Sequence, residues 1–118
     1  LWEKAARLAG LAAATVASGR PVGALREDET WRSRLREALA EACAVAAADG
    51  AALDPAAQWA IIETLPHELT TSTARDARLG RPTELDAITG SVVRAGARHG
   101  LPTPALAALL EEARCRAP

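Results

Sequence analysis

The stretch WEKAARLAGLAAATVAS, residues 2–18, decides the fold class. Its apolar residues recur every three or four positions, which is the spacing of one face of an α-helix. Gly19 and Pro21 end the pattern, because Gly favours a helix C-terminus and Pro cannot continue a helix. Gly10 lowers helix stability but suits a close crossing with a second helix. The stretch therefore predicts one long helix that begins at Trp2.

The rest of the chain has the same helical character. About a quarter of its 118 residues are Ala, and Phe and Tyr are absent, which favours helices over a sheet. Thr83 and Thr103 are expected to cap the last two helices. Periodicity, caps and Pro or Gly breaks predict five further helices, near residues 28–49, 55–65, 71–79, 84–98 and 104–113. We expect an all-α bundle of about six helices, with residues 1–118 as one domain.

Charge and composition argue against several classes of function. The 14 basic and 15 acidic residues form no basic stripe, so nucleic-acid binding is not expected. No apolar run approaches the ~20 residues that cross a bilayer, and no signal peptide is visible, so a cytoplasmic location is expected. Cys43 and Cys115 lack nearby Cys or His partners, which predicts neither a disulfide framework nor a metal site. His67 and His99 stand alone and suit orienting or capping roles.

Four short motifs follow one another along the chain. They are LWEK at residues 1–4, GRPVG at 19–23, GRPTELDAI at 80–88 and HGLPTP at 99–104. In order and spacing they resemble the C-terminal domain of ketopantoate reductases, an oxidoreductase family of pantothenate biosynthesis. The third motif, followed by Gly90 and Arg94, is the most specific. The resemblance implies a bundle like the C-terminal helical domain of 6-phosphogluconate dehydrogenase-like reductases.

The resemblance also implies a role for three residues. Lys4 matches the family's catalytic acid, since an ammonium can hydrogen-bond a carbonyl oxygen that gains negative charge and then protonate it. Ser72 matches a substrate-binding serine, and Glu84 matches a glutamate that contacts the nucleotide cofactor. Asp76 lies one helical turn after Ser72 on the same face and has no assigned role.

Each of these residues also has an ordinary structural explanation. Lys4 could be a solvated residue near a helix start. Ser72 could be the N-cap of its helix, and Glu84 a first-turn glutamate that the helix dipole favours. For Asp76, a solvated surface carboxylate is the simpler interpretation.

Four positions depart from the family pattern. Leu8, Ala12, Val22 and Thr89 stand where family members that reduce ketopantoate carry asparagine. Losing a buried amide costs about 1–3 kcal/mol for each partner left unpaired. We therefore expect a substrate other than ketopantoate, and loss of catalysis is the alternative.

The resemblance implies further partners. Its cofactor is NADP, bound mainly by an N-terminal Rossmann domain that this chain lacks, and its substrate is a small keto compound, such as a 2-oxo acid. A start at Leu1, without Met, suggests a piece of a longer protein. The chain by itself is expected to be inactive. The alternative function is a non-catalytic helical module for ligand binding or dimerisation.

The first and last helices predict self-association. The first is apolar around most of its second half, and the last adds three leucines. If these side chains form an exposed patch, a homodimer is the expected result; a first helix buried at the centre of a monomer is the alternative. The residues concerned are Leu11, Ala12, Ala13, Ala14, Val16, Leu106, Leu109 and Leu110.

Overall fold

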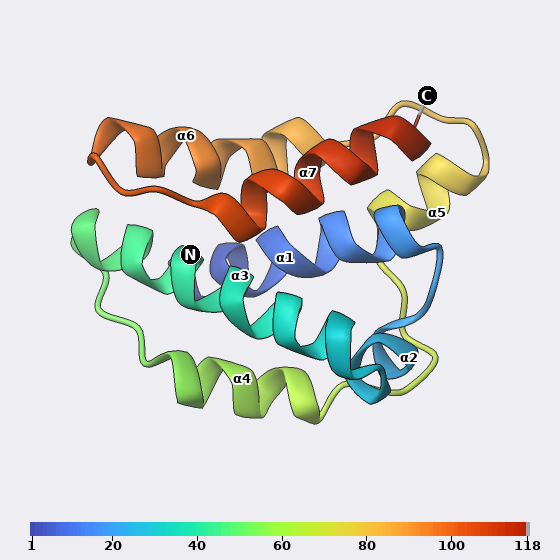
Figure 1. Ribbon diagram of the computed structural model, residues 1–118, viewed down its shortest axis with the longest axis horizontal. Coiled ribbons are helices and arrows are strands. Elements are labelled where there is room, and N and C mark those ends of the chain that lie inside the picture. The colour runs from blue at the N-terminus through green and yellow to red at the C-terminus, as the bar shows by residue number, and fades with distance from the viewer. Residues whose placement is uncertain (118) are drawn as a thin grey trace.

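The computed structural model describes residues 1–117, and within them every regular element is a helix (Figure 1). One of these elements, η1, is a π-helical turn that leads directly into α6. In chain order they are α1 (Trp2–Ser18), α2 (Val22–Glu27), α3 (Glu29–Ala48), α4 (Pro55–Glu63), α5 (Ser72–Arg78), η1 (Asp86–Gly90), α6 (Ser91–Arg98) and α7 (Pro104–Arg116). The all-α prediction is confirmed, and α1 has the predicted bounds.

Helix α1 forms the centre of the bundle. Figure 1 shows it between α6 and α7 on one side and α3 and α4 on the other, and it contacts all of them as well as α5 and η1. Its small side chains let these neighbours approach closely. A Cβ at Gly10 would lie 3.2 Å from the Cβ of Ala38 in α3, so the expected close crossing is present.

The exposed apolar patch expected on the first and last helices is absent from the described chain. The surrounding helices cover α1, and α7 turns its leucines toward α1. The expectation was wrong because even a chain of this size has enough helices to enclose one that is rich in Ala. The enclosed residues, each at most 5% exposed, are Leu11, Ala12, Ala13, Ala14, Val16, Leu106, Leu109 and Leu110.

Helix α2 was not predicted. Pro21 was expected to end helical structure, but it takes the N-cap position of a new helix with φ −71° and ψ 163°. The backbone N–H groups of Val22 and Gly23 donate to the carbonyls of Leu69 and His67, at 2.8 and 2.9 Å. Carbonyl groups of a distant loop thus accept the free N–H groups in the first turn of α2, a contact that local sequence patterns cannot reveal.

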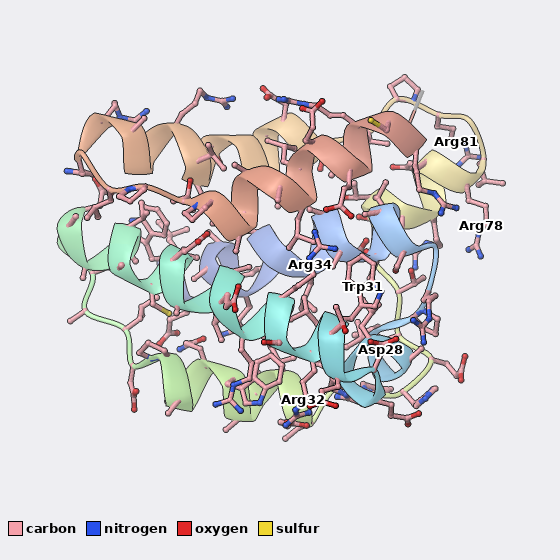
Figure 2. All side chains as sticks on the ribbon, in the orientation of Figure 1. Asp28, Trp31, Arg32, Arg34, Arg78 and Arg81 are labelled. Atoms are coloured by element: carbon pink, nitrogen blue, oxygen red, sulfur yellow. The ribbon has the colours of Figure 1, made fainter. Side chains whose placement is uncertain are left out.

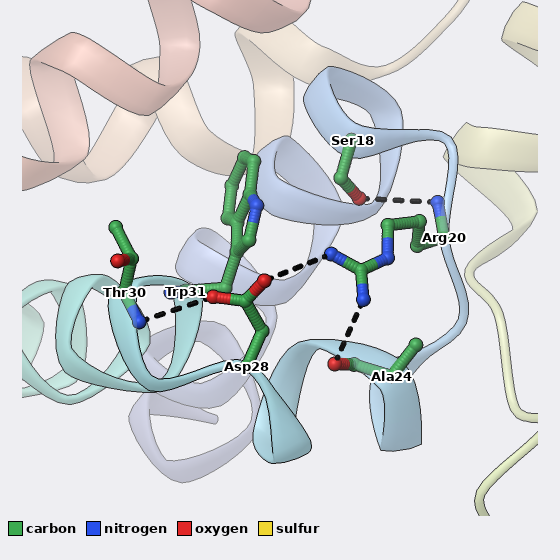
Figure 3. Close-up of polar contacts among 6 residues, drawn as sticks. All are labelled: Ser18, Arg20, Ala24, Asp28, Thr30 and Trp31. Atoms are coloured by element: carbon green, nitrogen blue, oxygen red, sulfur yellow. Dashed lines mark hydrogen bonds and ion pairs between the residues drawn. The ribbon is translucent and has the colours of Figure 1, made fainter.

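Asp28 organises the joint between α1, α2 and α3 (Figure 3). Its carboxylate caps α3 by accepting from the backbone N–H groups of Thr30 and Trp31, and it pairs with Arg20 at 3.3 Å. Arg20 also donates to the carbonyl of Ala24 at 3.4 Å. The N–H of Trp31 and the Arg20 guanidinium hold the pKa of Asp28 below its usual range. The carboxylate therefore stays charged where three helices meet.

The start of α7 is capped by another helix. Thr103 was expected to be the cap, but its side chain makes no capping bond within residues 1–117. Instead, the carboxylate of Glu41 in α3 accepts from the backbone N–H groups of Ala105 and Leu106, at 2.8 and 2.9 Å. This contact joins the middle of α3 to the first turn of α7.

Candidate functional site

Lys4 lies in the first turn of α1 with its side chain exposed. It is the only lysine of the 118 residues; the other 13 basic residues are arginines. Within residues 1–117, no hydrogen bond or ion pair engages its ammonium, so it can reach a ligand that approaches this end of α1.

Trp2 connects the helical turn that carries Lys4 to the end of α3. The indole N–H of Trp2 donates to Asp49 at the end of α3, with a distance of 3.0 Å. The other carboxylate oxygen of Asp49 lies 3.3 Å from Nε2 of His99, the residue that follows α6. The Trp2 indole and, to a lesser extent, the His99 ring lower the pKa of Asp49. Three helix ends are thus joined beside Lys4, and the motif's Trp has a structural purpose that spacing did not suggest.

Three of the four positions where the resemblance implies asparagine are buried. Ala12 is 1% exposed, and Val22 and Thr89 are fully buried. The hydroxyl of Thr89 donates to the carbonyl of Ala9 at 2.7 Å, so it links η1 to α1. Leu8, one turn after Lys4, is the only half-buried one of the four. A ligand at Lys4 would therefore meet an apolar side chain at Leu8.

Ser72 is the first residue of α5, and its side chain is exposed. Its alternative role as the helix cap is wrong, because Thr71 accepts from the N–H of Ala74 at 3.1 Å. The hydroxyl of Thr71 also lies 2.8 Å from that of Thr15, which ties the start of α5 to α1. Within the described chain the Ser72 hydroxyl has no bond partner, and Asp76 lies 4.0 Å from Arg81 rather than contacting Ser72.

Lys4 and Ser72 lie toward opposite ends of α1. Lys4 and Thr15 are eleven residues apart, which places them on the same side of a helix and about 16 Å apart along its axis. Ser72 follows the threonine that contacts Thr15. Within the described chain no hydrogen bond therefore joins the two predicted residues, and a ligand that contacts both would extend along α1.

Glu84 lies exposed, immediately before the helical residue Leu85. The turn that follows is π-helical, a distortion that is frequent at functional sites. The expected cap, Thr83, makes no capping bond within residues 1–117. The Glu84 carboxylate has no partner there either, whereas Asp86 pairs with Arg94 and Arg114 at 3.0 Å each. Arg94 first, then Arg114, lower the pKa of Asp86.

Several other features of the described residues bear on function. Residues 1–117 contain no cluster of three His, Cys, Asp or Glu side chains suited to a metal ion. None of their helices is both long and apolar enough to cross a membrane. Cys43 is buried and Cys115 exposed, and both are free thiols; burial raises the pKa of Cys43.

Residues 1–116 match the family model described as ketopantoate reductase PanE/ApbA C terminal. The chain belongs to this family. A 2-dehydropantoate 2-reductase from Mycobacterium tuberculosis is 36% identical over 97 residues, which are 80% of this chain and 32% of that protein.

Solved structures agree with this family. A PanE/ApbA family ketopantoate reductase from Ralstonia eutropha has a TM-score of 0.86 at 33% identity, covering 98% of this chain and 40% of that chain. A dimeric ketopantoate reductase from Staphylococcus aureus has a TM-score of 0.85 at 29% identity, covering 98% and 41%. The chain spans about a third of the length of the curated relatives that it matches.

Proposed function

We propose that this chain is the substrate-side, helical half of an NADP-dependent reductase that reduces a ketone in a small molecule. The family match over residues 1–116, together with an exposed lysine in the WEK motif, carries the proposal. The remaining part of such a reductase is an N-terminal Rossmann domain. A cytoplasmic location belongs to the proposal, and the free thiols Cys43 and Cys115 suit a reducing compartment.

Lys4 is the proposed proton donor. When bound, reduced nicotinamide would supply a hydride to the carbonyl carbon, and the carbonyl oxygen would then gain negative charge. The Lys4 ammonium hydrogen-bonds this oxygen and transfers one proton to it, which leaves an alcohol and a neutral amine. The bond between Trp2 and Asp49 supports this role, because it holds the turn that carries the ammonium.

Ser72 and Glu84 have proposed binding roles. The Ser72 hydroxyl can donate to a carboxylate or hydroxyl of the substrate, and Thr71 leaves it available by capping α5. Glu84 fits a cofactor contact, because an exposed carboxylate can accept hydrogen bonds from ribose hydroxyls. In this proposal Ser72 contacts a part of the substrate other than the carbonyl group that faces Lys4.

The proposed substrate is a ketone other than ketopantoate. Leu8 is the accessible neighbour of Lys4, and it can pack against an apolar group but cannot hydrogen-bond a hydroxyl. A site without hydrogen-bonding partners has little selectivity for a polar substrate over an apolar one. A 2-oxo acid with an apolar side chain fits these groups.

A second candidate function is a non-catalytic helical module that binds a ligand or forms a homodimer. Leu8, Ala12 and Val22 favour it, since they remove the amides that would hold the family's substrate. The dimeric S. aureus relative gives dimerisation some support. The burial of the leucines and alanines of α1 and α7 removes the sequence argument for a dimer.

The two candidates differ in an activity assay. The longer protein that contains this chain is mixed with NADPH and a panel of ketones, including ketopantoate and 2-oxo acids with apolar side chains. We expect NADPH oxidation with a less polar ketone and weak turnover of ketopantoate. Efficient ketopantoate turnover would refute the substrate proposal, and no turnover with any ketone would favour the non-catalytic module.

A further inference from the structure

A pocket of about 180 Å³ lies on the side of α5 away from Ser72. It is enclosed by the C-terminal half of α1, the residue Thr70, one face of α5 and the end of α7. Ala74, Ala77 and Arg78 line it, and helical geometry places Ser72 on the opposite face of α5. The pocket is therefore separate from the proposed catalytic surface.

Two arginines line this pocket. They are Arg78 from α5 and Arg116 from α7, and no acidic residue lies among its lining residues within 1–117. Figure 2 shows Arg78 projecting at the same end of the molecule as Arg81. Elsewhere, Arg20 and Arg34 pair with carboxylates, whereas neither pocket arginine forms an ion pair within the described chain.

Gly19 leaves room for the side chain of Arg116 at the end of α1. Nη1 of Arg116 donates to the carbonyl of Ala17 at 3.4 Å, next to the end of α1. Its Nη2 lies 3.2 Å from where a Cβ of Gly19 would be, and Gly19 has a φ of +67° that other residues rarely adopt. The absence of a side chain at Gly19 thus lets the Arg116 guanidinium lie beside the pocket. Only one of its N–H groups is used by the Ala17 carbonyl, so others can donate to a ligand.

The remaining polar group suited to a ligand is the hydroxyl of Thr70. No side-chain bond engages Thr70 within residues 1–117. The hydroxyl of Thr15, by contrast, donates to the carbonyl of Leu11 at 2.7 Å and bonds Thr71. Val16 and the two alanines of α5 add apolar lining. Two exposed arginines, one threonine and a small apolar surface thus line the pocket.

The charges favour an anion despite the adjacent helix ends. The C-termini of α1, α5 and α7, at Ser18, Arg78 and Arg116, all lie at this pocket, and the carbonyls of each carry the equivalent of roughly −0.5 charge, which disfavours anions. The two arginines bring a charge of about +2, so a net positive charge remains, and arginine forks match the oxygens of carboxylates and phosphates. We propose that this pocket is a binding site for a small oxyanion, a carboxylate or phosphate group, held by Arg78 and Arg116.

An NMR titration of the ¹⁵N-labelled chain tests this site. Inorganic phosphate and malonate are added separately, up to tens of millimolar, with NaCl keeping the ionic strength constant. We expect saturable shifts of amides in residues 15–19, 70–78 and 114–117, with a Kd in the millimolar range. Tighter binding of phosphate identifies a phosphoryl ligand, and tighter binding of malonate a carboxylate; either result supports the site.

Matched variants locate the site. Arg78→Gln and Arg116→Gln should each weaken binding about tenfold, as expected for losing a charge-assisted contact. Arg75→Gln removes a charge from the same helix that is exposed like Arg78 but does not line the pocket, and it should leave the Kd within about twofold. Shifts that never saturate, or equal weakening by all three substitutions, would overturn the proposal. Unchanged amide spectra of the free variants confirm that they remain folded.

Discussion

At the scale of single residues, Gly23 shows how tightly a loop packs on α2. A Cβ there would lie 2.3 Å from the His67 ring and 2.6 Å from the His67 Cα. A rotation of the His67 side chain could clear the ring but not the Cα. The backbone bonds from Val22 and Gly23 to the loop hold it in place, so the loop cannot retreat without breaking them.

Gly23→Ala should therefore lower the free energy of unfolding by about 1–3 kcal/mol, the usual cost of overpacking. Gly10→Ala is the matched control, because its Cβ would meet the Ala38 Cβ at 3.2 Å and the Leu35 Cδ2 at an ordinary contact distance of 3.9 Å. The gain in helix propensity of about 1 kcal/mol offsets that mild crowding. Urea unfolding of both variants provides the measurement. Equal stabilities for the two variants would contradict the packing described for Gly23.

Asp49 should make the contact beside Lys4 sensitive to acid. Its pKa is lowered in the folded chain, chiefly by the Trp2 indole, so its stabilising effect is complete above the unfolded value of about 3.9. That effect is lost as pH falls through the lower, folded pKa. The NMR signal of the Trp2 indole N–H should shift in this range, below about pH 4.

Asp49→Asn provides the control for this titration. Asn keeps an oxygen that can accept from Trp2 but does not titrate, so its Trp2 signal should show little change over the same pH range. A wild-type Trp2 signal that stays constant under acid, or one that follows the same curve in the variant, would mean that Asp49 does not control the contact.

At the scale of helices, Glu41 connects α3 to α7. Glu41→Ala removes the acceptor of two backbone N–H groups at the start of α7 and should cost about 1–2 kcal/mol of stability. Glu37→Ala is the control, because Glu37 lies one turn earlier on α3, is exposed and caps nothing in the described chain. Thermal unfolding compares the variants. Similar losses in both would show that the cap contributes little.

The sequence predicted helices where local signals suffice. The periodicity and Gly19 predicted the bounds of α1, and Asp54 followed by Pro55 predicted the start of α4, where Asp54 accepts from the N–H of Ala56. It missed α2 and the cap of α7, because a distant loop and Glu41 supply their bonds. Such partners depend on tertiary structure, which helix patterns do not encode.

For the candidate site, the sequence resemblance suggested residues but not their arrangement, and their roles stay predictions. Lys4, Ser72 and Glu84 are all exposed, as ligand-binding groups should be. Their spacing along the chain gave no sign that Lys4 and Ser72 lie toward opposite ends of α1. The Trp2–Asp49 contact also escaped prediction, since its partners are 47 residues apart.

At the scale of the whole molecule, the 118 residues by themselves should neither oxidise NADPH nor bind it appreciably. Glu84 is the only residue of the described chain proposed to contact the cofactor, and residues 1–117 contain no glycine-rich turn between a strand and a helix to hold its phosphates. Calorimetric titration with NADPH measures this, and the longer protein is the positive control. Micromolar binding by the 118 residues alone would contradict the assignment of the cofactor to another domain.

The most direct measurement is the kcat of Lys4→Gln in the longer protein, with its best ketone and saturating NADPH. Glu3→Gln, an exposed neighbour without a partner in the described chain, is the control. If Lys4 donates the proton, kcat should fall about 10²–10⁴-fold while the Kd for NADPH and the activity of Glu3→Gln stay near wild type. A kcat within a few-fold of wild type would show that another group protonates the substrate.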